Sequence, residues 1–108
     1  MKRGDIVSTI GRGDFSKKPR PSLIVQADAF NAHHPAFTVC PITSEISGDS
    51  LYRIPVSAND ENNLLVDSEI EIDLVQAIRR ERVGGLLGKA SDDTMILVDQ
   101  ALRRWLAL

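Results

Sequence analysis

The spacing of apolar residues changes once along this chain, at Ser91, and that change limits the folds open to it. After Ser91, apolar side chains recur at the spacing that places them on one face of an α-helix. Ser91 is a favourable helix N-cap, and Asp92 and Asp93 follow in the first turn, where the helix dipole favours negative charge. We therefore expect one helix from Ser91 to the end of the chain, with a buried stripe formed by Met95, Val98, Leu102, Trp105 and Leu106.

Before Ser91, apolar residues occur in short stretches separated by turn-forming residues, which is typical of β-strands. A length of 108 residues leaves room for a single domain, 1–108. Short strands and one terminal helix predict a mostly β fold, either a small antiparallel barrel or a curled sheet, on which the helix packs. The expected strands span residues 5–10, 22–26, 36–43, 51–56, 68–74 and 83–87, with one helical turn near 29–31.

Two of these strands carry more specific signals. Pro41 has no backbone N–H, so it predicts that the second half of the 36–43 strand lies at a sheet edge or in a bulge. In the 68–74 strand, apolar and acidic residues alternate, which predicts one buried side and one side facing solvent. The buried side would hold Ile70, Ile72 and Leu74, and the solvent-facing side Glu69, Glu71 and Asp73.

The charge of the chain is unevenly distributed. The formal net charge is −2 at pH 7, so the chain lacks the overall basic field of proteins that bind duplex DNA. Residues 1–20 hold six basic and two acidic side chains, whereas residues 44–73 hold eight acidic side chains and Arg53 as their one basic residue. Such asymmetry fits an ordinary solvated surface or a basic loop that holds phosphate, and the sequence leaves both open.

Several features bear on location and on metal binding. The chain has no run of about 18 apolar residues that would cross a membrane, and its N-terminus lacks the pattern of a secretory signal. The single Cys40 fits a reducing compartment, so we expect a cytoplasmic protein in which Cys40 is a small core residue. His33, His34 and Cys40 are too few for a structural zinc site, and we expect neither a metal nor another cofactor.

A set of polar residues remains at the predicted strand ends: Arg20, Thr43 with Ser44, and Asp73 with Gln76. They fit ordinary surface roles, such as capping a loop or forming ion pairs. They also suit reactions at a phosphate group. An arginine can donate to two phosphate oxygens at once, a hydroxyl can donate to another phosphate oxygen, and a carboxylate can accept a proton. Together these groups suit metal-independent RNA cleavage, in which the ribose 2′-OH is the nucleophile.

Four segments in register resemble the MazF/PemK family of toxins. In that family a GDIV strand leads through a loop to an RPxLVI strand, and later come a P-x-T-S strand end and a DQIRTI strand. In this chain, residues 3–7 and 18–25 match the first two strands, and residues 41–44 match the P-x-T-S strand end. Residues 67–78 match the region of the DQIRTI strand, and residues 82–84 lead into the terminal helix. The resemblance covers nearly the whole chain in the correct order.

The resemblance implies a homodimer with the SH3-like barrel shared by CcdB and MazF toxins, and a toxin of a type II toxin–antitoxin system. It implies sequence-specific cleavage of single-stranded mRNA, and neutralisation by an antitoxin with an acidic, disordered tail. The family's catalytic positions correspond to Arg20, Thr43, Ser44 and Asp73, with Asp73 as a candidate base. Arg12, Lys17, Lys18 and Gln76 would contact the RNA.

The chain departs from the family at several of these positions. Gln76 stands where many members carry arginine, Leu74 replaces a glutamine, and Phe15 replaces a frequent loop glutamate. Glu71 stands where some members carry a basic residue. Two alternatives therefore stay open: a CcdB-like poison of DNA gyrase that uses the terminal helix, and a nuclease-inactive member that only binds antitoxin or RNA. In the first alternative Trp105 would act at the surface, although we expect it to be buried.

Overall fold

The change of period at Ser91 marks a true boundary between a sheet and a helix in the computed structural model, which describes residues 1–10 and 18–108. The expectation of a capped terminal helix is confirmed, since the Ser91 side chain accepts a hydrogen bond from the Thr94 amide. The elements in chain order are β1 (Asp5–Thr9), β2 (Arg20–Ile24), α1 (Asp28–Asn31), β3 (Ala36–Thr43), β4 (Arg53–Val56), β5 (Ser68–Glu71), η1 (Ile72–Leu74), β6 (Gln76–Arg79), η2 (Arg80–Arg82), β7 (Val83–Lys89) and α2 (Asp92–Leu106).

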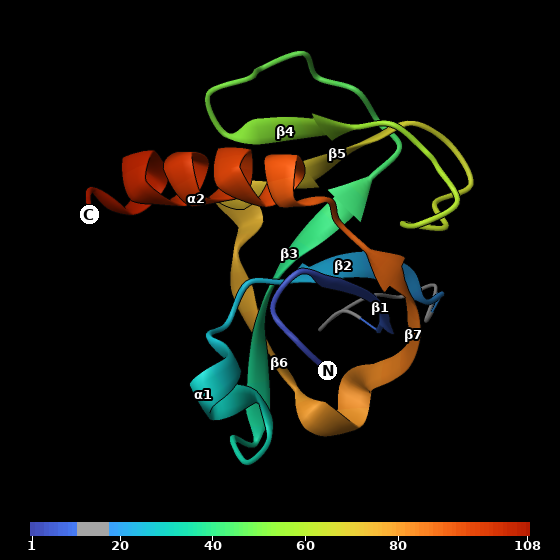
Figure 1. The fold of residues 1–108 in the computed structure, drawn as a ribbon, viewed down its shortest axis with the longest axis vertical. Coiled ribbons are helices and arrows are strands. Elements are labelled where there is room, and N and C mark those ends of the chain that lie inside the picture. The colour runs from blue at the N-terminus through green and yellow to red at the C-terminus, as the bar shows by residue number, and fades with distance from the viewer. Residues whose placement is uncertain (11–17) are drawn as a thin grey trace.

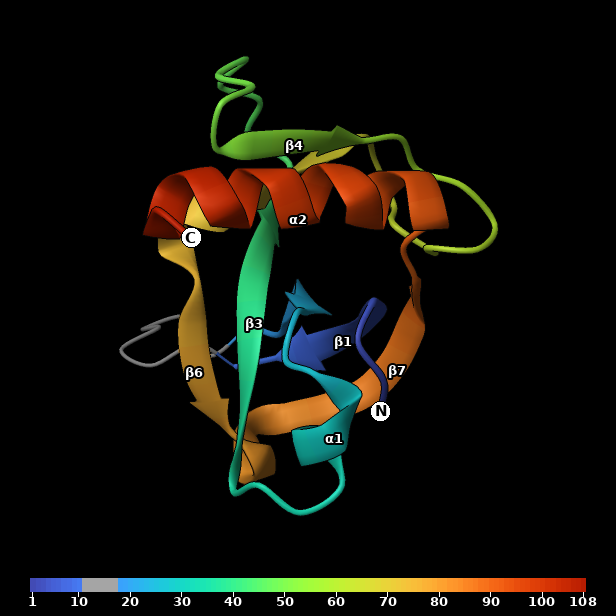
Figure 2. The same ribbon diagram turned by 60° about the vertical axis from the view of Figure 1, so that its left-hand side comes forward.

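The strands form one antiparallel sheet that curls but does not close. Their order is β4–β5–β3–β2–β1–β7, and β6 pairs with β3 beside β5. The mostly β fold with a terminal helix is confirmed, and of its two expected forms the structure has the curled sheet, because among the described strands β4 and β7 each pair on one side only. The helix α2 takes the place of a closing strand pair. It packs against β4 and η1 and lies across the curled sheet (Figures 1 and 2).

Strand β3 is the centre of the sheet rather than an edge, so the expectation for Pro41 is wrong. On one side β3 pairs with β2, and on the other side it pairs first with β6 through Val39 and then with β5 from Ile42. Pro41 lies where β3 changes from β6 to β5. The ladder of β3 with β6 ends at Val39 and the ladder with β5 begins at Ile42, so Pro41 lies between the two, where a residue without an N–H is tolerated.

The expected strand at 68–74 ends early, at Glu71, because the chain turns there into η1. The turn is closed by the Val75 amide, which donates to the Ile72 carbonyl, and the chain then continues as β6. Leu74 is consequently exposed instead of buried, and Glu69 is 2% exposed instead of facing solvent. Strand β6 itself was not expected from the local pattern.

The sheet is buried on both faces, around two hydrophobic clusters. One face packs against α2, with Ile42, Ile70, Val98 and Ala101 in its core. The other face forms a smaller cluster of Val7, Ile24, Phe37, Val39 and Ile78, which we call the second core. This second core lies on the same face as the polar residues described below.

The end of α2 is less buried than its apolar stripe predicts. Val98 and Ala101 are fully buried, whereas Trp105 is 48% exposed and Leu106 is 50% exposed. The Trp105 ring lies against the Tyr52 ring, with their centres 5.6 Å apart. The expected burial of Trp105 is therefore wrong: at this end of the helix Trp105 lies against Tyr52, and Arg104 donates to the Leu51 carbonyl.

Candidate functional site

Strand register brings Arg20 and Thr43 together on the face of the sheet that is opposite α2. Ile42 belongs to the core that packs on α2, so the alternation of β3 points Thr43 to the other face. Continuing the register of β2 with β3 brings Arg20 level with Thr43. Thr43 in turn pairs with Glu69 of β5. Two residues far apart in the sequence therefore lie side by side, as the resemblance predicts.

The backbone at Arg20 is held firmly by β1. The Thr9 hydroxyl donates to the Arg20 carbonyl at 3.3 Å, and it also shares a hydrogen bond of 2.8 Å with the Ser22 hydroxyl. Thr9 and Ser22 are 5% and 3% exposed, so this small network is shielded from water. It fixes the start of β2 while the Arg20 side chain itself is exposed.

The remaining predicted residues lie around this pair. The Thr43 hydroxyl accepts a hydrogen bond from the Glu45 amide, which orders the exposed turn at Ser44. Gln76 pairs with Val39, which places it on the same face, and its side-chain amide donates to the Leu74 carbonyl at 3.2 Å. Lys18 is exposed just before β2. The other two predicted RNA contacts, Arg12 and Lys17, lie outside the described residues.

Asp73 is held by an arginine that the sequence analysis did not select. Arg53 of β4 donates from Nε to Asp73 Oδ1 at 2.8 Å and from Nη2 to Asp73 Oδ2 at 3.1 Å. The Arg53 and Asp73 side chains are 18% and 16% exposed. The hydrogen bond to Asp73 is the main reason that the pKa of Arg53 is raised. Both carboxylate oxygens of the predicted base are thus engaged by one guanidinium group.

Glu71 lies between Arg53 and the predicted site. It pairs with Arg53 across β4 and β5, and Arg53 Nη1 lies 3.3 Å from Glu71 Oε2. Continuing the register of β5 with β3 places Glu71 beside Pro41, diagonal to Thr43. Burial raises the pKa of Glu71, and the positive charges of Arg53 and Arg20 partly oppose that shift. Glu71 is therefore close enough to Arg20 for the two charges to interact.

A buried carboxylate organises the loop that follows Thr43. One oxygen of Glu69 accepts hydrogen bonds from the Ser47 amide and hydroxyl, both at 3.0 Å, and the other accepts from the Gly48 amide at 3.0 Å. These bonds, with the Ser47 amide first, lower the pKa of Glu69 below its usual value. The ionised Glu69 therefore fixes this loop beside the predicted site.

We expect Glu69→Gln to destabilise the protein by about 1–3 kcal/mol at neutral pH, because an amide NH₂ would face donors of the loop. Since the folded-state pKa of Glu69 is lowered, its stabilising effect is present above the ordinary glutamate pKa and is lost as the pH falls through the folded value. Urea denaturation of both proteins at pH 7 and pH 3 measures this, and the difference should shrink at pH 3. If the two proteins differed in stability by the same amount at pH 7 and at pH 3, the charge of Glu69 would have no stabilising role.

Two other chemistries receive no support from the described residues. Cys40 is fully buried, and burial raises the pKa of its thiol to about 12, so the expectation of a core cysteine is confirmed. Within residues 1–10 and 18–108, no group of three or more His, Cys, Asp or Glu side chains could hold a metal ion. In the same ranges, no helix is long and apolar enough to cross a membrane.

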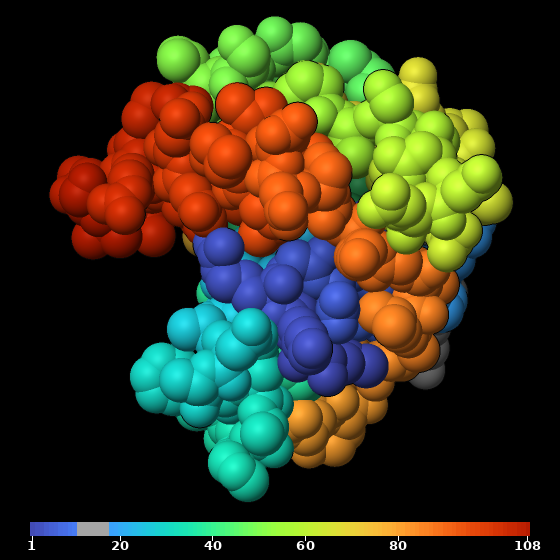
Figure 3. Space-filling view, in the orientation of Figure 1, coloured from blue at the N-terminus to red at the C-terminus, as the bar shows by residue number. Residues whose placement is uncertain are grey.

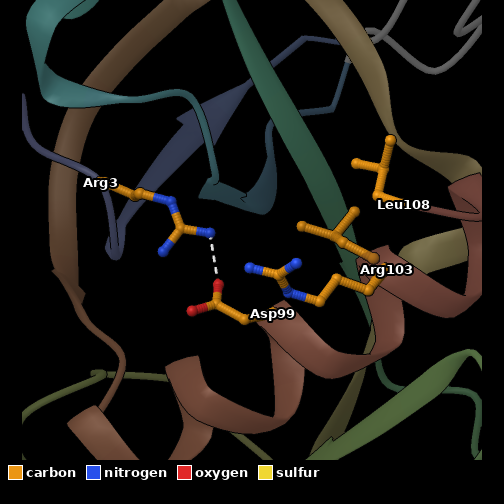
Figure 4. A pocket seen from close by; sticks show the side chains of 5 residues that line it. Arg3, Asp99, Arg103 and Leu108 are labelled. Carbon is orange, nitrogen blue, oxygen red and sulfur yellow. Dashed lines mark hydrogen bonds and ion pairs between the residues drawn. The ribbon is translucent and has the colours of Figure 1, made fainter.

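A pocket of about 320 Å³ lies on the α2 side of the sheet, away from Arg20 and Thr43. Figure 3 shows the hollow between the C-terminal part of α2 and the segment around α1, and Figure 4 shows its lining. Arg3 is already engaged there, since it bonds Asp99 at 2.6 Å and the Val25 carbonyl at 2.9 Å. The other residues that line the pocket are Leu102, Arg103 and Leu108. None of them has a hydroxyl or a carboxylate side chain. We therefore place the candidate site on the opposite face.

Comparison with known proteins identifies the family of the chain. A family model described as "PemK-like, MazF-like toxin of type II toxin-antitoxin system" matches residues 2–106. The chain is 33% identical over 108 residues to "Probable endoribonuclease MazF" of Mycolicibacterium smegmatis, covering 100% of this chain and 98% of that protein. Among solved structures, "Mycobacterium tuberculosis toxin MazF-mt6" has a TM-score of 0.82 at 24% identity, over 96% of this chain and 97% of that one. A mycobacterial "Endoribonuclease in complex with its cognate antitoxin" has a TM-score of 0.79 at 21% identity, over 100% and 96%.

Proposed function

Because the chain belongs to the PemK-like, MazF-like toxin family of type II toxin–antitoxin systems, we propose that it is an endoribonuclease that cleaves single-stranded mRNA at specific sequences without a metal ion. The observation that carries the proposal is the meeting of Arg20 and Thr43 on one face of the sheet. A guanidinium group and a hydroxyl side by side suit a phosphate, which needs charge compensation and a hydrogen-bond donor.

In this proposal the 2′-OH of a ribose attacks the adjacent phosphate. Arg20 stabilises the negative charge that develops on the phosphate oxygens, and Thr43 and Ser44 orient the scissile phosphate. Lys18, together with Arg12 and Lys17, holds flanking phosphates, and Gln76 contacts the RNA from β6. Asp73 is the predicted base, but both of its oxygens accept hydrogen bonds from Arg53.

The alternatives are less well supported. The family model and the curated relative both name MazF-type proteins, which favours a nuclease over a CcdB-like gyrase poison. The half-exposed Trp105, which lies against Tyr52, would be accessible for the gyrase alternative, so the family match rather than the exposure of Trp105 favours the nuclease. A nuclease-inactive binder is separated from an active enzyme only by the assay below.

The partners follow from the family. One similar structure is named as an endoribonuclease with its cognate antitoxin, and we propose that this chain is neutralised by an antitoxin in the same way. An acidic, disordered tail would lie over Lys18 and Arg20 and compete with RNA phosphates. We further propose that the toxin is a homodimer and acts in the cytoplasm, where its mRNA substrate is found.

The test is to incubate the purified protein with a long single-stranded RNA in EDTA. We expect a few discrete fragments, each upstream product ending in a 2′,3′-cyclic phosphate and each downstream product starting with a 5′-OH. An oligonucleotide with 2′-deoxyribose at the mapped cleavage position should stay intact, because it lacks the nucleophile. A folded protein that leaves RNA uncut, or that cuts only with added metal, would overturn the proposal.

A further inference from the structure

We propose that Glu71 is the general base of this reaction, taking the proton from the 2′-OH, while Asp73 serves to hold Arg53 in place. The inference deepens the proposed function and depends on it. It arises because the site contains two candidate carboxylates whose surroundings differ. One is fully engaged by an arginine, and the other faces the residues that would bind the phosphate.

The contacts of Asp73 argue against a role in proton transfer. Its two oxygens each accept a hydrogen bond from Arg53, at 2.8 and 3.1 Å. A bidentate pair with a guanidinium group stabilises the ionised carboxylate and fixes its orientation, so proton uptake would weaken both charge-assisted hydrogen bonds. It also lies in η1, beyond the end of β5, rather than on the ladder that aligns Thr43.

Glu71 lies on the face of the sheet that carries the predicted phosphate-binding residues, as a general base must. It lies on β5 two residues after Glu69, the partner of Thr43, and therefore on the same face of the sheet, to which Arg20 also belongs. Its side chain is 15% exposed, and its Oε2 lies 3.3 Å from Arg53 Nη1. A carboxylate on the same face as Arg20 and Thr43 is placed to reach a 2′-OH once a phosphate is bound there.

The charges around Glu71 set its proton affinity. Arg53 of β4 and Arg20 of β2 favour the ionised form, whereas Asp73 of η1 and Glu45 of the loop after β3 disfavour it. Burial has the largest effect, so the pKa of Glu71 is raised overall. A base works best when its pKa lies near the working pH, and a raised value moves a glutamate in that direction.

The step balances without any further reactant. The O2′–P bond forms as the 2′-OH proton moves to Glu71, and the P–O5′ bond breaks. The leaving 5′ oxygen takes a proton from water, and Glu71 returns its proton to solvent. The products are a 2′,3′-cyclic phosphate and a 5′-OH, and nothing is oxidised or reduced.

The experiment measures kcat and KM against pH on a single-stranded RNA oligonucleotide that contains one mapped cleavage site. For Glu71→Gln we expect kcat to fall by about 10²–10⁴-fold with KM little changed. We also expect its acidic limb, the fall in rate at low pH, to disappear. Asp73→Asn should keep the acidic limb, and Glu81→Gln, an exposed change in η2, should match the wild type. Melting temperatures check that each variant is folded.

Glu71→Asp covers the case in which Glu71→Gln fails to fold. It keeps the charge beside Arg53 but withdraws the oxygen by one methylene, so we expect a folded protein whose kcat falls at least about tenfold, that is about 1.4 kcal/mol. The inference is overturned if Glu71→Gln keeps the wild-type kcat and acidic limb, or if the limb is lost in Asp73→Asn instead. If the wild type itself does not cleave RNA, the proposed function fails as well, which separates the two failures.

Discussion

Arg20→Ala is expected to lower kcat/KM for RNA cleavage by about 10²–10³-fold, because it removes a preformed donor to the phosphate oxygens on which negative charge develops. The expectation follows from the place of Arg20 level with Thr43, and from the shielded hydrogen bonds that fix its backbone to Thr9. Arg20→Lys keeps the charge but cannot bind two phosphate oxygens in one plane, so its activity should lie between those of Arg20→Ala and the wild type. The measurement is the initial rate on the single-site oligonucleotide in EDTA.

The matched control is Arg103→Ala, an exposed arginine on α2 at the opposite side of the sheet. We expect its cleavage rate to equal that of the wild type. Trp105→Ala serves a second purpose, since a gyrase poison that acts through the terminal helix would depend on that residue. Toxicity that is lost in Trp105→Ala and kept in Arg20→Ala would contradict the nuclease and favour the poison.

Local sequence patterns correctly predicted those elements whose formation depends on interactions between residues close together in the sequence. The cap at Ser91 and the bounds of β3 were correct, because a capping hydroxyl and a run of β-forming residues act over a few positions. Strand β6 was missed because its four residues gain their structure from pairing with β3, which is distant in the sequence. Pro41 was misplaced for the same reason, since only the order of the strands shows that β3 changes partners there.

In the candidate site, too, the residues within sequence motifs could be predicted, whereas the contacts between distant strands could not. Arg20 and Thr43 were found through motifs, and the register of the strands brings them together. The pairing of Arg53 with Asp73 and Glu71 could not be predicted, because it depends on the register of β4 with β5 across a long connection. The one available signal was that Arg53 is the only basic residue among the eight acidic ones of residues 44–73. An isolated charge in a segment of opposite sign is a reasonable candidate for a partly buried ion pair.

The second core is expected to be essential for stability, and Phe37→Ala tests this. Phe37 is 1% exposed, pairs with Ile78, and lies under the guanidinium group of Arg80, whose Cζ is 4.4 Å from the ring centre. Replacing such a side chain removes buried apolar surface and leaves a cavity, so we expect a loss of about 3–5 kcal/mol in the free energy of unfolding. Urea denaturation at neutral pH measures it.

Phe30→Ala is the matched control, because the same atoms are removed from a side chain that is 58% exposed in α1. We expect a change within about 0.5 kcal/mol. The comparison decides whether both faces of the sheet need a core. If Phe37→Ala costs no more than Phe30→Ala, the face that carries Arg20 and Thr43 is stabilised by α2 from the other side alone. If the expected loss is found, the second core is what keeps β3 and β6 together, and with them the positions of Thr43 and Gln76.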